Sequence, residues 1–541
     1  MKYVAVTGGV ISGLGKGITA SSIARILKAR GVTVTPLKID PYLNVDAGTM
    51  NPYQHGEVFV LDDGTEVDLD LGNYERFLGE NLAGNHNITT GKVYRSVIDK
   101  ERHGDYLGNT VQIIPHVTGE VKRMIREVGE SSGAEVAIIE VGGTVGDIES
   151  MPFLEALREM QQEVGRREDM AFIHTTLVPV LGAVGEAKTK PTQHSVREMR
   201  ALGIQPDMII ARSEKPISQD IKTKISLFCG VPPEAVVSVP DVACIYDVPL
   251  NLEKEGVGDY LVKRLGLTNR PAEWGTWKTF TTRYHEATGE VNLAIVGKYS
   301  GLKDSYLSHS EALHHTQGQV GVRVNVHWFD AEPFGTPNAS LAPLEKMDGI
   351  LIPGGYGKRG VEGKIRAIEY AREQKVPLLG ICLGFQLAAV EVARHLLDQP
   401  DANSTEFDPA TKHAVVGLLK EQGAIKDLGG TQHLGAQKVL LTEGSRVATL
   451  YGRKEILERH RHRYEIEPGY ITPFTEKGYR ATGFSPDGRV EALELEGHPY
   501  FLGVQYHPEF LSRPEAPHPL FVGLVQAAIQ HHNGGEVPSH G

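Results

Sequence analysis

Short apolar runs alternate with longer segments of helical period through the first half of the chain. The β-branched run Lys2–Thr7 predicts a strand, the pattern over Lys16–Arg30 predicts a helix that stops at Gly31, and Val32–Ile39 predicts a second strand. Together they form a βαβ unit with a glycine-rich loop between strand and helix, which favours a parallel sheet. Further strands of this sheet are expected at Ala134–Val141, Ala171–Val180, Asp207–Ala211 and Ala235–Val239.

The periodic pattern breaks over residues 266–290, where proline, glycine and polar residues follow one another without a clear period. We expect a linker there, with at most one helical turn. A second βα series then begins, with strands expected at Val291–Gly297, Arg323–Trp328, Gly349–Ile352 and Val376–Leu379. The pattern thus predicts an α/β protein with a parallel-sheet domain over residues 1–265 and a second α/β domain over residues 291–535.

Length, charge and cysteine usage narrow the class of protein. A chain of 541 residues is too long for one hydrophobic core, and a net charge of −12 argues against broad contact with nucleic acid or anionic membrane. No apolar run approaches the roughly 18 residues of a membrane span, and no signal peptide precedes the first strand. The three cysteines form no C-x-x-C pair, so we expect a reducing, cytoplasmic location with neither a disulfide framework nor a zinc site.

The loop after the first strand, "VTGGVISGLGKGITASS" from Val6 to Ser22, is similar to a phosphate-binding loop but departs from it twice. The pattern G-x-x-x-x-G-K-[ST] requires glycine where Val10 stands and a hydroxyl residue where Gly17 stands. Its place between a strand and a helix is the context that a nucleotide-binding loop requires. The sequence therefore predicts a variant phosphate loop in which another group replaces the hydroxyl that usually holds magnesium.

In the second domain a cysteine stands between two glycines, directly after a predicted strand. Cys382 in "GICLGFQ" has the spacing of a nucleophile elbow, and the following helix N-terminus favours its thiolate. The Leu383 N–H and the turn Pro353–Gly355 would supply the hydrogen-bond donors for an oxyanion. His507 and Glu509 stand two residues apart and would face one side of a strand. His507 would then act as the base, and Glu509 would orient it. A lone cysteine in an apolar run is usually a core residue, but the three motifs in this order favour a catalytic one.

These motifs together resemble a class I glutamine amidotransferase domain with a cysteine, histidine and glutamate triad. The resemblance implies that Cys382 attacks the glutamine amide, forms a thioester and releases ammonia. It places the substrate glutamine against Gly355, Leu383, Gly384, Phe385, Gln386, Glu406 and Arg463.

Several further stretches extend the resemblance over nearly the whole chain, in order, and identify it as similar to the CTP synthase family. They are Lys38–Val60, Asp68–Phe77, Glu140–Ser150, Gly185–Val196, Asn403–Phe407 and Glu458–Glu465. By this resemblance the first domain is a P-loop-like synthetase (amidoligase) domain that binds ATP and UTP.

Two acidic residues next to predicted strand ends are candidates for magnesium. Asp70 and Glu140 offer the hard oxygen ligands that Mg²⁺ prefers, and Lys16 and Lys38 would neutralise phosphate charge during transfer. Each acid alone would more often be a solvated surface group, but as a pair beside a phosphate loop they favour magnesium. The resemblance assigns ATP binding to Gly13, Leu14, Gly15, Lys16, Gly17, Ile18, Lys38, Asp70, Asp241 and Val242.

The basic, hydroxyl-rich turn "KTKPTQ" is suited to a triphosphate, although taken alone it is more often a solvated loop. In the family this turn belongs to the UTP site, where CTP competes as a feedback inhibitor and which forms between the subunits of a dimer that pairs into a tetramer. The residues implied are Ser12, Asp147, Ile148, Glu149, Lys188, Thr189, Lys190, Pro191, Thr192, Gln193 and Lys224.

The resemblance implies that ATP phosphorylates O4 of UTP and that ammonia, passing through the interior by Tyr53 and His55, displaces the phosphate to give CTP. His55 has an alternative interpretation, as a packed core histidine. In the family GTP activates glutamine hydrolysis, and the resemblance implies the same regulation here, although His433 stands where arginine is common and Leu307 where lysine can occur.

Two other classes of protein remain as alternatives at this point. One is an amidotransferase of the cobyric acid synthase type, which would have no use for the triphosphate-binding turn. The other is a ParA-like nucleotide-dependent assembly switch, which would have no use for the triad Cys382, His507 and Glu509.

Overall fold

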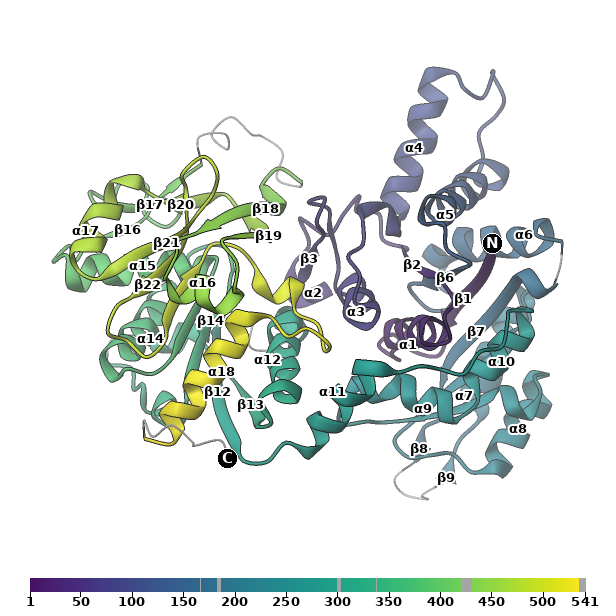
Figure 1. The fold of residues 1–541 in the computed structure, drawn as a ribbon. Coiled ribbons are helices and arrows are strands. Elements are labelled where there is room, and N and C mark those ends of the chain that lie inside the picture. Colours follow the sequence, from purple (N-terminus) through teal and green to yellow (C-terminus); the bar gives the residue numbers. More distant parts are fainter. Residues whose placement is uncertain (166, 182–185, 299–302, 337, 420–429, 535–541) are drawn as a thin grey trace. The chain divides into compact units, whose positions relative to one another are not determined.

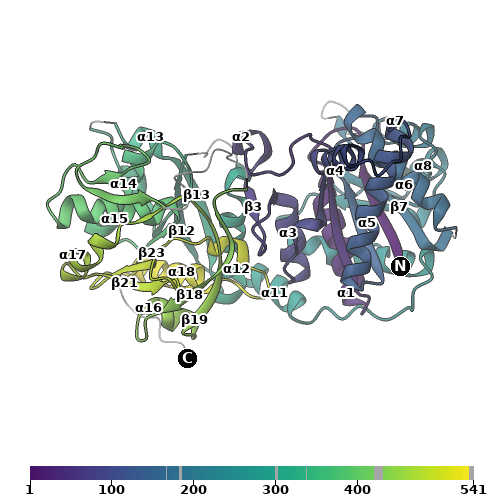
Figure 2. The same cartoon turned by 90° about the horizontal axis from the view of Figure 1, so that it is seen from above.

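The computed structural model describes residues 1–165, 167–181, 186–298, 303–336, 338–419 and 430–534 (Figures 1 and 2). The chain forms two compact units. The first comprises Met1–Asp46 and Asn73–Gly275, and the second comprises Ala47–Gly72 and Thr276–Gly541. The short segment Ala47–Gly72 therefore packs with residues that follow it by more than two hundred positions.

The first unit is built on a seven-stranded sheet whose neighbouring strands all run parallel. Its spatial order is β11 (Val236–Pro240), β10 (Met208–Ser213), β7 (Met170–Leu177), β1 (Lys2–Gly8), β6 (Val136–Val141), β2 (Val34–Asp40) and β5 (Asn87–Thr89). The larger helices of this unit are α1 (Lys16–Ala29), α4 (Thr90–His103), α5 (Thr118–Ser132), α6 (Met151–Glu163), α7 (Lys190–Ala201), α8 (Gln219–Cys229), α9 (Val248–Lys254) and α10 (Val257–Arg264). The predicted βαβ unit and parallel sheet are confirmed, although the run Ala171–Val180 divides into β7 and the separate strand β8 (Val180–Leu181), which pairs with β9 (Glu186–Ala187).

The second unit is built on a nine-stranded mixed sheet. Its order is β13 (Arg323–Asp330), β12 (Glu290–Gly297), β14 (Gly349–Ile352), β15 (Leu378–Ile381), β23 (Phe501–Val504), β22 (Val490–Leu495), β21 (Tyr479–Phe484), β18 (His433–Leu441) and β19 (Glu455–His462). The first five strands are parallel and the last four add antiparallel partners. Smaller sheets join β16 (Asn403–Ser404), β17 (Ala414–Leu418) and β20 (Tyr464–Ile466), and join β3 (Val58–Val60) with β4 (Glu66–Asp68).

Helices cover both faces of this second sheet because the parallel strands are buried on both sides. Ala294 and Val296 of β12 pack in one cluster with α14 (Val361–Gln374) and α15 (Leu383–Leu396). Leu293 and Ile295, which point to the opposite face, pack with α12 (Leu307–Val320) and α18 (Pro519–His532). Shorter helices of this unit are α2 (Pro52–His55), α13 (Ala331–Phe334), α16 (Arg446–Tyr451) and α17 (Ile471–Glu476).

The expected linker contains more helix than the sequence suggested. Helix α11 (Gly275–Glu286) occupies 12 residues of the 266–290 stretch, where at most one turn was expected. Trp277, Phe280 and Thr281 on one side of α11 are buried, at the i, i+3, i+4 spacing of an amphipathic helix. The prediction of a largely non-helical linker was wrong, because a short apolar stripe is a weak helical signal in a stretch that also contains proline and glycine.

Candidate active site

Cys382 sits at the sharp turn between β15 and α15, as the elbow predicts. Its backbone lies at φ 52° and ψ −104°, a conformation that non-glycine residues rarely adopt. A Cβ on Gly384 would lie 2.0 Å from the Ile352 carbonyl oxygen, and one on Gly380 would lie 2.8 Å from the Gly384 carbonyl oxygen. Both glycines of the G-x-C-x-G motif are therefore required, because backbone approaches backbone where side chains would stand.

His507 and Glu509 form a buried pair next to this turn. His507 Nδ1 and Glu509 Oε1 are 2.6 Å apart, and both residues are buried. Burial opposes protonation of His507, but attraction to the Glu509 carboxylate and to negative charge on the Cys382 sulfur outweighs it and raises the pKa of His507 to about 10. The pair therefore stabilises an imidazolium, which is the charge that a thiolate–histidine couple carries.

The local structure around this pair differs from the expected strand. His507 and Glu509 follow the end of β23, with His507 as the cap of a short 3₁₀ helix over Pro508–Leu511. Pro508 cannot extend a strand ladder and occupies the first helical position instead. The two side chains meet through this turn rather than through strand alternation.

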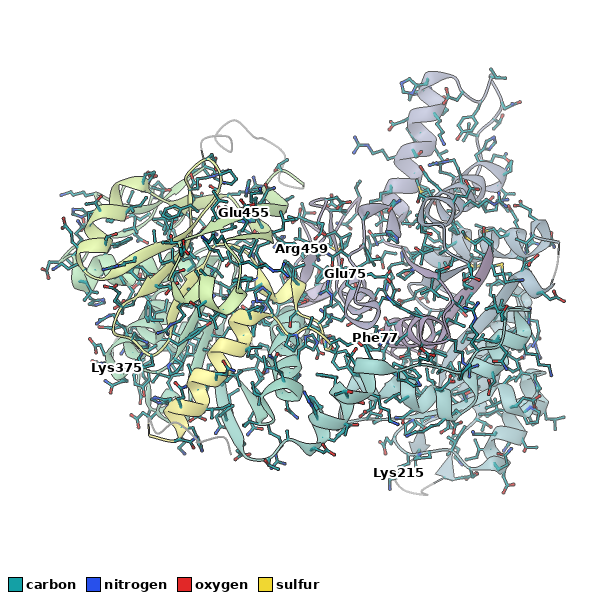
Figure 3. All side chains as sticks on the ribbon, in the orientation of Figure 1. Glu75, Phe77, Lys215, Lys375, Glu455 and Arg459 are labelled. Carbon is teal, nitrogen blue, oxygen red and sulfur yellow. The ribbon has the colours of Figure 1, made fainter. Side chains whose placement is uncertain are left out.

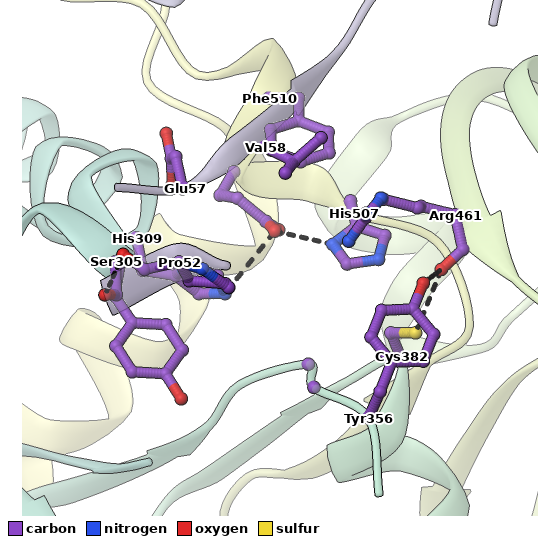
Figure 4. Close-up of a pocket in the computed structure, with 14 residues that line it drawn as sticks. Pro52, Glu57, Val58, Ser305, His309, Tyr356, Cys382, Arg461, His507 and Phe510 are labelled. Carbon is purple, nitrogen blue, oxygen red and sulfur yellow. Dashed lines mark hydrogen bonds and ion pairs between the residues drawn. The ribbon is translucent and has the colours of Figure 1, made fainter. Parts of the chain in front are cut away.

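The cysteine, histidine and glycine-turn motifs converge on one cavity of about 80 Å³ (Figure 4). A Cβ on Gly354 would be 3.1 Å from His507 Cε1 and 3.6 Å from Cys382 Cβ, so the glycine turn lies against both groups. The Cys382 thiol donates to the Arg461 carbonyl oxygen at 3.6 Å, and Gln505 Nε2 donates to Cys382 Sγ at 3.7 Å. The arrangement holds a nucleophile, a base and close backbone around one small space, which suits acyl transfer.

Two residues that line this cavity were not among the predicted site residues, although Glu57 lies within the stretch Lys38–Val60 that carries the family resemblance. His309 on α12 is buried, with its Nε2 3.4 Å from Glu509 Oε1, and burial lowers its pKa to about 4. Glu57 accepts hydrogen bonds from the Ser308 backbone N–H at 2.9 and 3.0 Å and from the Ser308 hydroxyl. His309 thus contacts the acid of the triad as a neutral imidazole, and Glu57 ties the segment Ala47–Gly72 to the start of α12.

The predicted glutamine-binding residues have unequal positions. Gln386 is buried and donates through Nε2 to the Tyr464 carbonyl oxygen at 2.9 Å. Glu406 accepts from the Gly357 N–H at 2.8 Å, and Arg463 donates to Thr431 Oγ1 at 3.0 Å. The Phe385 side chain lies in the hydrophobic core. Of the residues predicted to bind glutamine, Gly355 lines the cavity, and Leu383 and Gly384 directly follow Cys382.

The predicted ammonia-path residues lie on α2. The Tyr53 hydroxyl donates to the Lys298 carbonyl oxygen at 2.8 Å and accepts from Arg359 at 2.7 Å. His55 is exposed, so its alternative interpretation as a packed core histidine is wrong. The residues of this segment that line the cavity are Pro52, Glu57 and Val58 instead.

The glycine-rich loop of the first unit has left-handed backbone at three positions. Val10, at the position where the pattern requires glycine, has φ 81°, and Gly13 and Gly15 have φ 75° and 81°. A Cβ on Gly8 would lie 2.6 Å from Cδ of Lys16, whose Nζ donates to the Gly143 carbonyl oxygen at 2.7 Å. The chain keeps the left-handed backbone at Val10 in spite of its β-branched side chain, which is a strained arrangement of the kind found at binding sites.

Glu140, the candidate magnesium ligand of the first unit, is buried at the end of β6. Lys38 Nζ donates to Glu140 Oε1 at 3.1 Å, and the Tyr74 hydroxyl donates to Glu140 Oε2. Lys38 pairs in register with Glu140, so both stand at the carboxyl ends of neighbouring parallel strands. Asp70 lies in α3 (Leu69–Leu78), within the segment that packs with the second unit, and its role beside Glu140 stays a prediction.

A second cavity, of about 530 Å³, opens beside the loop in the first unit. Its lining includes Val10, Thr144, Lys190, Pro191 and the unpredicted His194. Behind it, the His174 ring is hydrogen-bonded to the Thr7 hydroxyl at 2.9 Å and to the Ser195 hydroxyl at 2.7 Å. Burial and, second to it, the positive charge of Lys16 lower the pKa of His174 to about 4. The strand end, the loop and the predicted triphosphate turn therefore do meet in this unit.

The remaining predicted nucleotide residues have the following positions. Thr189 and Thr192 are buried within the turn, Gln193 donates to Thr189 at 3.0 Å, and Lys188 pairs with Glu186. Asp147 accepts from the Thr144 N–H at 2.9 Å. Exposed positions are Ser12, Ile148, Glu149, Lys190, Lys224 and Asp241. Asp241 follows β11, as expected, and pairs with Arg212 at 2.8 Å.

Comparison with known proteins identifies the family to which the chain belongs. A family model for the CTP synthase N-terminus matches residues 2–267, and a model for class-I glutamine amidotransferases matches residues 301–527. The CTP synthase of Methanopyrus kandleri is 58% identical over 530 residues, which cover 98% of this chain and 99% of that protein. The CTP synthase of Thermococcus kodakarensis is 56% identical and covers 97% and 98%. The chain belongs to the CTP synthase family.

Membership in the CTP synthase family makes the protein a glutamine-hydrolysing ligase that forms CTP from UTP, with ATP as the second nucleotide substrate. The cobyric acid synthase alternative is not favoured, and neither is a switch without catalysis. A solved structure described as the Trypanosoma brucei CTPS glutaminase domain with bound acivicin is 36% identical and covers 44% of this chain and 94% of its own, with a TM-score of 0.42.

Two further observations bear on the expectations for this CTP synthase family member. In the part of the chain that the structure describes, no helix is long and apolar enough to cross a membrane. His433 begins β18 and Leu307 begins α12, whereas residues 420–429, shortly before His433, lie outside the described residues.

Proposed function

We propose that the second unit supplies ammonia from glutamine and that the first unit uses it. Cys382 attacks the side-chain carbonyl carbon of glutamine while His507, held by Glu509, carries the proton from the thiol to the leaving ammonia. Water then hydrolyses the thioester to glutamate. The observation that carries this assignment is the strained elbow of Cys382 beside a His507–Glu509 pair at 2.6 Å.

In the proposed amination, ATP transfers its γ-phosphoryl group to O4 of UTP, and ammonia displaces that phosphate at C4 to give CTP, ADP and phosphate. Lys16 and Lys38 balance the negative charge of the nucleotides. The predicted UTP-binding residues around the turn Lys188–Gln193 hold the triphosphate, and CTP competes there as a feedback inhibitor. Support comes from the cavity that joins Val10 with Lys190 and Pro191.

Magnesium fits the donor chemistry of this site. Glu140 is a buried carboxylate, one oxygen of which faces Lys38, and carboxylate oxygens are the ligands that Mg²⁺ takes. Glu140 and Asp70 would hold the ion, which supplies charge neutralisation of the phosphates. Asp70 thereby replaces the hydroxyl that the variant phosphate loop lacks at Gly17.

Ammonia reaches the amination site through the interior in this proposal, by way of Tyr53 and the neighbouring residues of its segment. Support comes from the cavity at Cys382, which Pro52, Glu57 and Val58 line. We further propose a homotetramer built as a dimer of dimers, activation by GTP, and a cytoplasmic location.

The deciding assay follows the absorbance of CTP formed from UTP, ATP and glutamine. Cys382→Ala is expected to lose glutamine-dependent synthesis by at least about a thousandfold and to keep synthesis from added ammonia. Full glutamine-dependent activity in this variant, or no product from the unmodified enzyme, would overturn the assignment.

Asp70→Ala separates the magnesium assignment from the glutaminase. We expect this variant to lose CTP formation with either nitrogen source while glutamine hydrolysis continues, because the ion neutralises the phosphates only in the amination. Retained CTP formation with added ammonia contradicts a role for Asp70. A glutamine-dependent rate that GTP leaves unchanged would remove GTP from the proposal.

A further inference from the structure

Three histidines gather on one face of the hairpin formed by β18 and β19. His433 pairs in register with His462, and Gly435 pairs with His460, so the three imidazoles share one side of the two strands. The alternate residues Arg459 and Arg461 point to the other side, where they bind Asp62 and Glu66. Gly435 itself lies against the segment Asp62–Gly64, where an added Cβ would stand 2.7 Å from the Asp62 carbonyl oxygen and from the Gly64 nitrogen.

The spacing of these rings is that of a coordination site. Their centroids are 5.1 to 5.3 Å apart, and one nitrogen from each ring lies within 4.8 Å of the others. His460 Nδ1 and His462 Nε2 are 3.1 Å apart. Two ligands on a tetrahedral ion with metal–nitrogen distances of 2.0–2.1 Å stand about 3.3 Å apart, so this edge is already at coordination distance.

The polar groups around the rings are incompletely satisfied in the described part of the chain. His460 is fully buried, and its Nε2 has no hydrogen-bond partner there. The Glu491 carboxyl group lies beside it, with Oε2 3.7 Å from His460 Nδ1 and likewise without a hydrogen-bond partner. Buried polar groups left in this way are uncommon and often mark an ion or ligand that belongs there.

We propose that His433, His460 and His462 bind one divalent transition-metal ion, for which Zn²⁺ is the best fit, at a site distinct from the magnesium site of the amination. Imidazole donors suit zinc, cobalt, nickel and copper, whereas Mg²⁺ requires oxygen ligands. His433 is only partly buried, which leaves the ion a way in, and Glu491 stands close enough to support a ligating ring as a second partner.

Occupancy of this site is coupled to the glutaminase. Arg461, between the two strand histidines, presents its carbonyl oxygen to the Cys382 thiol at 3.6 Å. The Tyr464 carbonyl oxygen accepts from both Gln386 at 2.9 Å and His462 at 3.1 Å. An ion that holds His460 and His462 therefore restrains the backbone that surrounds the nucleophile, and we expect it to alter glutamine hydrolysis more than synthesis from added ammonia.

The test uses the full, untagged chain, stripped of metal and titrated with Co²⁺ and then Zn²⁺. Four proteins are compared: the unmodified enzyme, Cys382→Ala to exclude thiol coordination, His433→Gln to remove the most exposed ligand, and His532→Gln as a matched control. His532 is half exposed and pairs with Asp348 far from the hairpin. Calorimetric unfolding of each variant checks that it is folded.

We expect one equivalent of Co²⁺ to bind, with the visible bands of a tetrahedral nitrogen site that Zn²⁺ abolishes. His433→Gln should weaken binding by at least about tenfold, while Cys382→Ala and His532→Gln bind like the unmodified enzyme. Zn²⁺ should raise the unfolding temperature of the unmodified enzyme and not that of His433→Gln. Failure to bind either ion at micromolar concentration, equal binding by His433→Gln, or bands lost in Cys382→Ala would each overturn the proposal, whatever the outcome for CTP synthesis.

Discussion

At the scale of single residues, the neighbours of a buried group decide whether it carries charge. His507 and His309 are both buried next to Glu509, yet they end with opposite protonation. His507 has the Glu509 oxygen at 2.6 Å and the thiol beside it, which raises its pKa to about 10, whereas at His309 burial prevails and lowers the pKa to about 4. The Glu509 carboxylate thus stabilises one positive charge, on His507, and His309 stays a neutral imidazole.

A pH prediction follows for His309. Its folded-state pKa is below its unfolded value, so the unfolded chain takes up a proton first as the pH falls from about 6.5 to about 4, and stability is lost in that window. A shift of this size corresponds to about 3 kcal/mol. His309→Gln should flatten the fall in unfolding temperature of the second unit, measured by scanning calorimetry from pH 7 to pH 4.

The matched control for this experiment is His327→Gln, since His327 is only partly buried and bonds Asn292 at 2.9 Å. It should reproduce the profile of the unmodified enzyme. A profile of His309→Gln that runs parallel to that of the unmodified enzyme would contradict the assignment of a depressed pKa.

At the scale of elements, the positions of the glycines set the geometry of the nucleophile. Strand β15 and helix α15 meet at Cys382 with almost no room between their backbones and β14. The same rule governs the loop before α1, where Gly8 makes space for the Lys16 side chain. In both units a strand passes into a helix through a strained turn, so the helix N-terminus directly follows Cys382 in one unit and the glycine-rich loop in the other.

Gly384→Ala tests the elbow. The added Cβ would stand 2.0 Å from the Ile352 carbonyl oxygen, so the start of α15 must move. We expect glutamine hydrolysis to fall by about a hundredfold or more, since a displacement near 1 Å has that effect on positioned groups, while ammonia-dependent synthesis persists. Gly469→Ala, where a Cβ meets nothing within 4 Å, serves as the control and should behave like the unmodified enzyme.

At the scale of the whole molecule, the segment Ala47–Gly72 leaves the N-terminal part of the sequence and packs with the second unit. Arg459, labelled in Figure 3, is fully buried and donates to Asp62 at 2.6 Å and to the Val60 carbonyl oxygen at 3.1 Å. Arg461 binds Glu66 at 2.7 Å. The segment that lines part of the Cys382 cavity is thus held by the two arginines that alternate with the histidines of β19.

Arg459→Met tests this attachment. It removes the buried partner of Asp62 and Val60, which should destabilise the second unit by roughly 3 kcal/mol. Because the segment borders the cavity, we expect more glutamine to be hydrolysed for each CTP formed. Calorimetry and the ratio of glutamate to CTP measure the two effects, with Lys454→Met, whose pair with Glu443 is exposed, as the control. An unchanged ratio would mean that the segment does not guide ammonia.

The role of the glycine-rich loop in phosphate binding stays a prediction. The sequence did predict the parallel sheet of the first unit, the strand-to-helix turn at Cys382 and the closeness of His507 to Glu509, which it expected on a strand. These features depend on neighbours within a few residues, where hydrophobic period, glycine and proline act directly. Three contacts between distant segments were found only in the folded structure: His309 borders Glu509, Ala47–Gly72 belongs with the second unit, and three histidines share one face of a hairpin. The cysteine pattern carries no sign of the histidine cluster, because the pairing of β18 with β19 brings His433 to His462 across the hairpin. Contacts of this kind are made by packing between distant segments, and no local pattern in the chain records them.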